Sequence, residues 1–184
     1  MNMFTTQVSG SVELAILELR HAPLLFELVR ANHSRLLEWC PWLDDVETIE
    51  KTEEFIRTKL TKFAIDNGFT AGLFESRKLI GVVALEYIDR TNNVTEIGYW
   101  LDRAAVGRGL IISACRRLID HAFTDLNLER VQIRCASENF RSRAIPEKLG
   151  FTKEGVIRQC ERLHNRTVDL VVYGMLRDEW NLQI

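Results

Sequence analysis

Apolar residues recur at every second position in several short segments of the chain, which is the pattern of β-strands with one buried face. The first such segment is Ser11–Leu19, which carries Val12, Leu14 and Ile16 in alternate positions. Three consecutive segments joined by short turns are predicted to form an antiparallel meander. They are Phe69–Glu75, Lys78–Tyr87 and Val94–Leu101. Three later segments are also predicted as strands: Arg130–Ala136, Lys153–Arg158 and Thr167–Met175.

Apolar residues at helical spacing occupy the segments between these strands. Pro23 opens the first predicted helix, because proline is tolerated in a first turn. A second helix is predicted over Thr48–Asn67, and Gly68 is suited to end it. The clearest helix is Gly109–Leu126, whose apolar pairs recur every four residues and form one broad stripe. A shorter helix is predicted over Asn139–Leu149.

The order of these elements, βααβββαβαββ, predicts the fold class. Because consecutive predicted strands are joined by short connections, the pattern favours an α+β fold with a largely antiparallel sheet. We expect a single domain that occupies residues 1–184. A chain of this length can bury about 70% of its unfolded surface, so the core does not need a disulfide or a structural metal.

Composition and charge narrow the class of protein. The chain is 46% hydrophobic and 27% charged, with a formal net charge of -2 and a pI near 6.1. This balance argues against a nucleic-acid binder, which would carry a strong basic excess. No apolar run approaches the roughly 20 residues that span a bilayer, and Met1–Gly10 lacks the features of a secretory signal. We therefore expect a cytoplasmic protein that binds neither nucleic acid nor membrane.

The spacing of the cysteines and histidines indicates no metal site. Cys40, Cys115, Cys135 and Cys160 form no C-x-x-C pair, and the four histidines form neither H-x₃-H nor H-E-x-x-H. We expect no bound metal, and we expect free, buried thiols. Neither G-x-S-x-G nor G-x₄-G-K-[ST] occurs, which removes the usual support for a serine hydrolase or a P-loop protein.

The segment Val106-Gly107-Arg108-Gly109 leads directly from a predicted strand into the longest amphipathic helix. Unpaired backbone N–H groups and the positive end of the helix dipole form an anion site at such a junction. A G-x-G pair alone does not distinguish a phosphate site from a plain turn. Residues 101–150 hold nine Lys and Arg against six Asp and Glu, so this segment carries +3 and the remainder of the chain −5. The local excess is suited to a polyphosphate ligand.

Five blocks of sequence resemble the GNAT family of acetyl-CoA-dependent N-acetyltransferases, and within it the RimL/RimJ-type branch that acetylates N-terminal amines of ribosomal proteins. The blocks, in order, are Glu96–Asp102 (EIGYWLD), Gly107–Gly109 (GRG), Ala114–Phe123, Ser137–Phe151 and Asp169–Trp180. The resemblance covers nearly the whole chain. It implies a GNAT-like α/β/α domain with a central, mostly antiparallel, splayed mixed sheet.

The resemblance also implies acetyl-CoA as cosubstrate. In the family, amides of the glycine loop bind the pyrophosphate of coenzyme A, and the pantetheine arm runs between strands that correspond to Val94–Leu101 and Arg130–Ala136. The family signature Q/R-x-x-G-x-G/A is altered here at both ends, to Val106 and Ile111. The residues expected to bind the cofactor are Leu101, Gly107, Arg108, Gly109, Leu110, Ile111, Asn139 and Ser142.

Acetyl transfer needs a base for the amine, donors for the developing oxyanion and an acid for the thiolate. Many members of the family place a tyrosine acid at the position of Pro146, so the resemblance implies Ser142 as the acid here. It implies Glu161 as the base, with Glu96 on the central strand as the rival. Pro146 cannot donate a hydrogen bond to the Ser142 carbonyl, which predicts an irregular or hydrated turn.

Two tryptophans, Trp39 and Trp42, lie in the loop between the first two predicted helices. They could form a wall of the acceptor site or fill a core beneath that loop. Since no cysteine falls on the family's motif positions, we expect direct transfer in a ternary complex, without an acyl-enzyme. The resemblance implies a protein N-terminus as the acceptor and a homodimer. A small-molecule amine stays open as the acceptor: a polyamine, an aminoglycoside or an aminoacyl-nucleotide. An acidic pocket lined by Asp44, Asp45 and Glu47 would favour a polyamine, whereas a neutral, open groove would favour a peptide. A CoA-binding sensor without activity is the non-enzymatic alternative.

Overall fold

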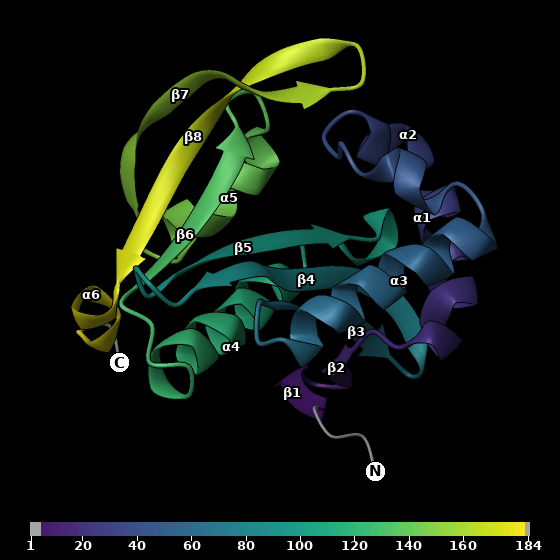
Figure 1. Ribbon diagram of the computed structural model, residues 1–184, viewed down its shortest axis with the longest axis horizontal. Coiled ribbons are helices and arrows are strands. Elements are labelled where there is room, and N and C mark those ends of the chain that lie inside the picture. The colour runs from purple at the N-terminus through teal and green to yellow at the C-terminus, as the bar shows by residue number, and fades with distance from the viewer. Residues whose placement is uncertain (1–4, 183–184) are drawn as a thin grey trace.

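The computed structural model describes residues 5–182, and its centre is one twisted sheet of eight strands (Figure 1). The strand order is β1-β2-β3-β4-β5-β6-β8-β7, and every neighbouring pair is antiparallel except β5 and β6. The strands are β1 Thr5–Ser9, β2 Val12–Ile16, β3 Phe69–Glu75, β4 Lys78–Asp89, β5 Val94–Leu101, β6 Arg130–Ala136, β7 Thr152–Leu163 and β8 Arg166–Leu176.

Helices cover both faces of this sheet. The α-helices are α1 Ala22–Ala31, α2 His33–Leu37, α3 Ile49–Ala64, α4 Leu110–Thr124, α5 Phe140–Lys148 and α6 Arg177–Asn181, and the short 3₁₀ turns are η1 Leu19–His21, η2 Leu43–Val46 and η3 Arg103–Ala105. Helices α1 and α3 lie over one face of β3 and β4, and α4 lies over the other (Figure 1). The result is the α/β/α arrangement that the family resemblance implies.

The strands separate two hydrophobic cores because successive side chains point to opposite faces. In β3, Leu73 packs with the core beneath α4, and its neighbour Phe74 packs with the core beneath α1 and α3. In β4, Val83 and Val82 divide in the same way. A strand buried on both faces reads as a continuous apolar run, as β4 does.

The sheet opens between β5 and β6, the fifth and sixth strands in its order. The parallel pairing of β5 with β6 is confined to Val94–Glu96 and Arg130–Gln132, whereas β6 pairs with β8 along its whole length. Figure 1 shows β6, β7 and β8 rising away from β5 as one arm, with α2 facing the tip of that arm. The opening between β5 and β6 is the splay that the family resemblance implies.

The observed elements differ from the predicted ones mainly at their ends. The predicted strand Ser11–Leu19 is shorter, since it ends at Ile16 and is followed by η1. The closing hairpin is longer than predicted, because β7 extends to Leu163 across a bulge. Three five-residue elements, β1, α2 and α6, were not predicted.

The described residues contain no helix that is both long and apolar enough to cross a membrane. Over the same residues, no group of three or more His, Cys, Asp or Glu side chains is arranged to hold a metal ion.

All four cysteines are free: Cys115 and Cys135 are buried as expected and Cys40 is half-buried, but Cys160 is exposed, contrary to the prediction of buried thiols.

Candidate active site

The loop between β5 and α4 forms a cradle of backbone groups. Gly107 and Gly109 both have left-handed backbone angles, with φ of +86° and +74°, and Gly109 is the N-cap of α4. A Cβ atom added at either glycine would meet nothing within 4 Å. The first intrahelical bond runs from Ser113 N–H to the Gly109 carbonyl, which leaves the preceding N–H groups without an acceptor in the helix. Open space beside free donors at the positive end of a 15-residue helix fits a phosphate group.

The other residues expected at the cradle are arranged so that only their backbone is available. Leu110 and Ile111 bury their side chains in the core beneath α4. Arg108 forms a two-bond ion pair with Glu75 at the end of β3, at 2.5 and 3.0 Å. Val106 is exposed, so replacing the family's polar residue by valine leaves the backbone of the cradle intact.

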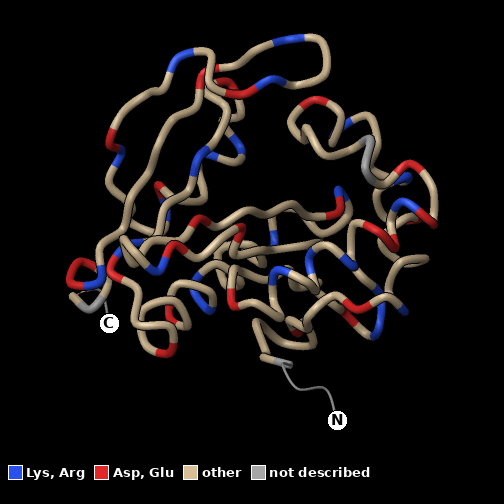
Figure 2. Tube along the Cα trace, in the orientation of Figure 1, with Lys and Arg blue, Asp and Glu red and all other residues tan. Residues whose placement is uncertain are grey.

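Ion pairs with the rest of the chain largely offset one another in the charge count for residues 101–150. Three arginines of the segment pair with carboxylates outside it: Arg108 with Glu75, Arg130 with Glu154 and Arg134 with Glu96. Two carboxylates of the segment, Glu129 and Glu138, pair in turn with Arg177 and Arg166 outside it. Positive and negative residues are interspersed along the trace in Figure 2. The basic side of the molecule therefore stays a prediction.

Backbone groups of β5 face the opening between β5 and β6. Asp102 N–H donates to the Ile80 carbonyl of β4 at 2.7 Å. Since hydrogen-bonded positions alternate along an antiparallel pair, the N–H and C=O groups of Leu101 and Tyr99 point the other way, toward β6. Strand β6 has already diverged at that level. Because the Leu101 carbonyl accepts a hydrogen bond from Arg35 of α2, the groups left for an extended ligand are the Leu101 N–H and the N–H and C=O of Tyr99. A ligand with amide groups can bind to these as an added strand would.

Ser142 lies on the opposite wall of this opening, in the first turn of α5. Asn139 caps the helix, because its Oδ1 accepts a hydrogen bond from the Ser142 N–H at 3.1 Å. The Ser142 hydroxyl lies 3.3 Å from the Cys135 sulfur and 3.4 Å from the Tyr99 hydroxyl. These contacts come from three elements, β5, β6 and α5, that meet at the splay.

Tyr99 completes the turn that Pro146 leaves without a donor. Its hydroxyl donates to the Ser142 carbonyl at 2.8 Å, so a side chain supplies the hydrogen bond that Pro146 cannot donate in the turn expected to be irregular or hydrated. Burial raises the pKa of Tyr99 well above its usual value, and the nearby Cys135 and Cys115 add to the shift. Tyr99 is therefore a protonated donor at neutral pH. The proline at 146 was the only sign of this role in the sequence.

The two candidate carboxylates lie in different environments. Glu96, on β5, is only 12% exposed and accepts hydrogen bonds from Arg134 at 2.8 Å and from Gln132 at 2.9 Å. Glu161, on β7, accepts no hydrogen bond from any residue that the structure describes. Burial raises the pKa of Glu161, and the charge of Glu96 raises it further, against the opposing charge of Arg134. Of the two carboxylates, Glu96 has side-chain partners and Glu161 has none among the described residues.

A bulge in β7 determines where Glu161 lies. Ile157 pairs with Leu170 and Glu161 with Val168, so residues 158–160 oppose the single residue Asp169. The Gln159 N–H donates to the Asp169 carboxylate at 2.8 Å, and Gln159 has a φ of +46°. Bulges beside active sites turn a side chain out of the regular alternation. Such an irregularity leaves no periodic signal in the sequence.

The two tryptophans have separate surroundings. Trp42 is partly buried and packs against the core beneath α1 and α3, with its ring centroid 5.8 Å from Phe55 and 6.0 Å from Trp100. Trp39 instead packs against a small cluster on the far arm: Ala136, Leu163, Val168 and Leu170. It therefore connects the loop after α2 to the β7–β8 hairpin.

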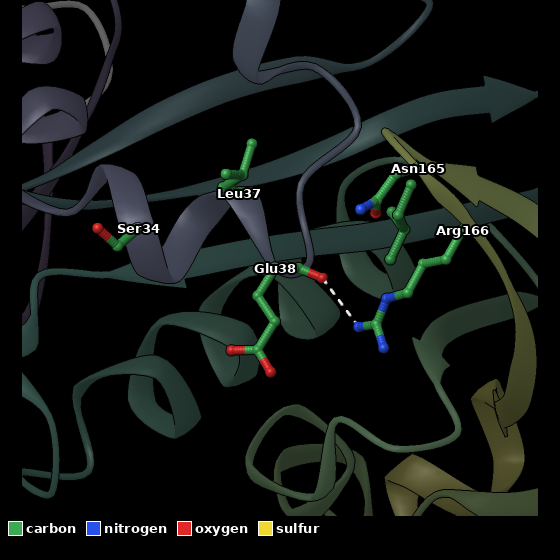
Figure 3. A pocket seen from close by; sticks show the side chains of 6 residues that line it. Ser34, Leu37, Glu38, Asn165 and Arg166 are labelled. Carbon is green, nitrogen blue, oxygen red and sulfur yellow. Dashed lines mark hydrogen bonds between the residues drawn. The ribbon is translucent and has the colours of Figure 1, made fainter.

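A pocket of about 310 Å³ lies between α2 and the tip of that hairpin. Figure 3 shows Arg166 reaching across to the main chain of Glu38, where its guanidinium donates to the carbonyl at 3.2 Å. The same guanidinium lies 4.9 Å from the ring centre of Trp39 and pairs with Glu138 at 3.1 Å. The lining residues are Ser34, Leu37, Glu38, Leu163, Asn165 and Arg166. The side chains of Asp44 and Asp45, expected to favour a polyamine, lie outside the described residues.

The comparisons with known proteins agree with this geometry. The model of the acetyltransferase (GNAT) domain matches residues 12–152. The chain belongs to the GNAT family. It is similar to YdaF of Bacillus subtilis, which carries a provisional name as a ribosomal N-acetyltransferase, with 37% identity over 97% of this chain and 98% of that protein. It is also similar to the ribosomal-protein-serine acetyltransferase of Escherichia coli, with 30% identity over 95% of this chain and 97% of that one.

A solved GNAT structure with coenzyme A supports the cofactor site. The structure of RimL, a ribosomal L7/L12 α-N-protein acetyltransferase, superimposes with a TM-score of 0.91 at 26% identity, covering 96% of this chain and 99% of that one. In it, coenzyme A is joined by a disulfide to a cysteine of that protein. The fold and branch expected from the sequence are thus confirmed. This GNAT chain is an N-acetyltransferase with acetyl-CoA as cosubstrate.

Proposed function

We propose that this enzyme acetylates the N-terminal α-amine of a ribosomal or other protein by direct transfer. The observation that carries the proposal is the Glu161 carboxylate, whose pKa is raised and which no described residue hydrogen-bonds. An α-amino group has a pKa near 7.7–8.0, against about 10.4 for lysine. Since its proton is easier to remove, a single partly buried carboxylate is a sufficient base for it. The names of the two relatives above support the same acceptor.

Each step of the transfer is assigned to a group at the splay. Acetyl-CoA supplies the activated acetyl thioester. Glu161 takes the proton from the amine as its nitrogen bonds to the acetyl carbon. The backbone N–H of Leu101, at the end of β5, faces the opening and holds the negative charge that develops on the carbonyl oxygen. Ser142, supported by Tyr99, returns a proton to the sulfur as the carbon–sulfur bond breaks.

The assigned cofactor residues belong to the same proposal. The cradle at Gly107, Arg108, Gly109, Leu110 and Ile111 binds the pyrophosphate through its amides. Leu101 and Asn139 contact the pantetheine arm across the opening.

Direct transfer is favoured over an acyl-cysteine intermediate by the state of Cys135. This thiol lies beside Ser142, but burial raises its pKa, and the hydrogen bonds from Ser142 and Tyr99 only partly oppose that shift. The nucleophilic form of cysteine is the thiolate, so a buried thiol with a raised pKa is a poor nucleophile at neutral pH.

The proposal also includes a single catalytic domain over residues 1–184, a cytoplasmic location and a homodimer. The continuous sheet from β1 to β8 supports one domain. A ribosomal acceptor supports the location. For the dimer, the support is the outer strand β7, which ends the sheet order and exposes Val156 and Ile157.

A turnover assay tests the proposed acceptor. Release of free thiol from acetyl-CoA is measured with N-terminal peptides of ribosomal proteins, with polyamines and with aminoglycosides. We expect turnover with at least one peptide and a kcat/KM for it that exceeds those of the other two classes. Turnover confined to polyamines or aminoglycosides would assign a small-molecule acceptor. If coenzyme A binds but none of the three classes of amine is acetylated, the protein would be a non-catalytic sensor of coenzyme A.

Tyr99 and Ser142 are expected to act as one unit in protonating the leaving thiolate. Ser142→Ala should lower kcat about 100-fold and Tyr99→Phe about 10-fold, within the range for a general acid and its support. Because both changes disrupt the same proton path, the double variant should be no slower than Ser142→Ala alone. Tyr87→Phe, which loses a hydroxyl bonded to Gln132 at 2.9 Å, is the matched control. Additive losses of kcat in the double variant would contradict the shared role.

A further inference from the structure

The pocket at the tip of the β7–β8 hairpin has walls that are fixed to each other. Arg166 on β8 donates to the Glu38 carbonyl at 3.2 Å, and the Nε2 atom of His164 lies 3.1 Å from the Cys40 carbonyl oxygen. These two contacts join the tip of the hairpin to the segment after α2, and Figure 3 shows the first of them. The volume of about 310 Å³ is at the lower end for ligand sites, so the pocket fits one long side chain.

The pocket shares one face of the hairpin with the proposed base. In the regular ladder beyond the bulge, Glu161 pairs with Val168 and Leu163 with Arg166. Glu161 and Leu163 are two residues apart on β7, so their side chains point to the same face, which their cross-strand partners share. Leu163 and Arg166 line the pocket. Glu161 therefore lies on the face that carries the pocket, about 7 Å along the strand from it.

The acceptor amine approaches the opening from this same face. Cys135 on β6 points toward α5, where its sulfur lies 3.3 Å from the hydroxyl of Ser142, the proposed acid. Its neighbours Arg134 and Ala136 point to the other face, because side chains alternate along a strand. There Ala136 packs in one cluster with Leu163. The acid and the base thus lie on opposite faces of the arm, and the amine comes from the side of the base.

A peptide bound at Glu161 extends toward the tip of the hairpin. At the other end of this face, Glu96 on β5 accepts hydrogen bonds from Gln132 at 2.9 Å and from Arg134 at 2.8 Å, both on β6. These side chains bridge the two strands at the base of the opening. In an extended peptide the second Cα atom lies about 5 Å from the terminal nitrogen. The side chain of the second residue is therefore level with the pocket.

Among the described residues that line the pocket, Glu38 alone carries a charge without a counter-charge. Arg166 pairs with Glu138 at 3.1 Å, and its guanidinium lies 4.9 Å from the ring centre of Trp39. The Glu38 carboxylate has no ion pair or hydrogen bond with any residue in the described part of the chain, and Figure 3 shows it turned away from Arg166. A long cationic side chain could pack its methylene groups on the two leucines of the pocket and place its charge at Glu38.

We propose that the pocket binds a lysine or arginine side chain at the second position of the acceptor peptide, with Glu38 as its counter-charge. The inference rests on the proposed function and adds a sequence preference to it. An exposed ion pair contributes little and a charge-assisted hydrogen bond somewhat more, so the expected preference is moderate. Glu38 is then a specificity-determining residue that acts through KM and leaves kcat unchanged.

Two peptides that differ only at the second residue test this assignment. Both begin with alanine, and the second residue is lysine in one and norleucine, which has the length of lysine without its charge, in the other. The wild-type kcat/KM should be about 5- to 10-fold higher for the lysine peptide. This preference should shrink in 1 M salt, which screens exposed charges. Glu38→Gln should use the two peptides equally well, and Glu38→Lys should prefer a peptide with glutamate at that position.

The matched control is Glu27→Gln on α1. It also removes one exposed carboxylate, which pairs with Arg30 at 3.2 Å and does not line the pocket. It should retain the wild-type preference, and the Kd for coenzyme A should be the same in all four proteins. Equal use of the lysine and norleucine peptides by the wild-type enzyme, or an unchanged preference in Glu38→Gln, would overturn this inference and leave the proposed function intact. If no peptide is acetylated at all, the proposed function itself fails.

Discussion

Glu161→Gln is expected to lower kcat/KM for an N-terminal peptide about 10²- to 10⁴-fold at pH 7, the usual contribution of a general base. The amide keeps the size of the side chain and removes its ability to take a proton. The base must be ionised to act, and the pKa of Glu161 is raised. The wild-type rate should therefore fall as the pH drops through that raised pKa. The loss in the variant should shrink as the pH rises past 7.7–8.0, where the acceptor amine deprotonates unaided.

The rival carboxylate provides the control for this experiment. Glu96→Gln removes the ion pair with Arg134 and should lower stability without removing the acidic limb of the pH profile. If the fall of the rate at low pH disappeared in Glu96→Gln and persisted in Glu161→Gln, Glu96 would be the base instead. Protein stability provides a second check. A raised carboxyl pKa means that ionisation of Glu161 opposes folding above its unfolded pKa, so Glu161→Gln should be at least as stable as the wild type at pH 7.

Gly109→Ala and Gly107→Ala are expected to raise the Kd for coenzyme A about 10- to 100-fold, as measured by calorimetry. Each would place a methyl group in the space that the pyrophosphate needs, and would weaken two or more charge-assisted hydrogen bonds from the cradle. Each should also lower the free energy of unfolding by about 1–2 kcal/mol, because alanine is strained in the left-handed region that both glycines occupy.

Gly10→Ala separates the strain from the binding effect. Gly10 lies in the turn between β1 and β2, has a φ of +53°, and a Cβ there would also meet nothing within 4 Å. It is not part of the cradle. It should therefore show a similar loss of stability with an unchanged Kd for coenzyme A. If the two loop variants bound coenzyme A as Gly10→Ala does, the cradle would not be the phosphate site.

Elements with long, regular patterns were predictable from the sequence, and short ones were not. The predicted strand Arg130–Ala136 coincides with β6, and the predicted helix Gly109–Leu126 contains all of α4, because each buries a full periodic face. The strand β1 has only five residues, four of them polar, and α2 has only five residues after a break at Asn32. Fewer than two periods of a pattern cannot be distinguished from a loop, so tertiary packing alone defines these elements.

The parts of the site also differ in how far they could be predicted from the sequence. The cradle was predictable because residues adjacent in the chain form it: two glycines and the start of one helix. Which carboxylate lacks a partner could not be predicted, because it depends on distant residues. Glu96 accepts a hydrogen bond from Arg134, 38 residues away, and the position of Glu161 depends on a bulge that is hydrogen-bonded to Asp169.

The sequence by itself determined the family, the order of the main elements and the anion cradle, because periodicity and turn chemistry act over neighbouring residues. Only the tertiary structure decided which carboxylate is free, which group closes the turn at Pro146 and where Arg35 lies. Those outcomes depend on contacts between residues far apart in the chain, 43 residues for Tyr99 with Ser142 and 66 for Arg35 with Leu101. A pair at such separation meets only after the sheet has formed and opened between β5 and β6.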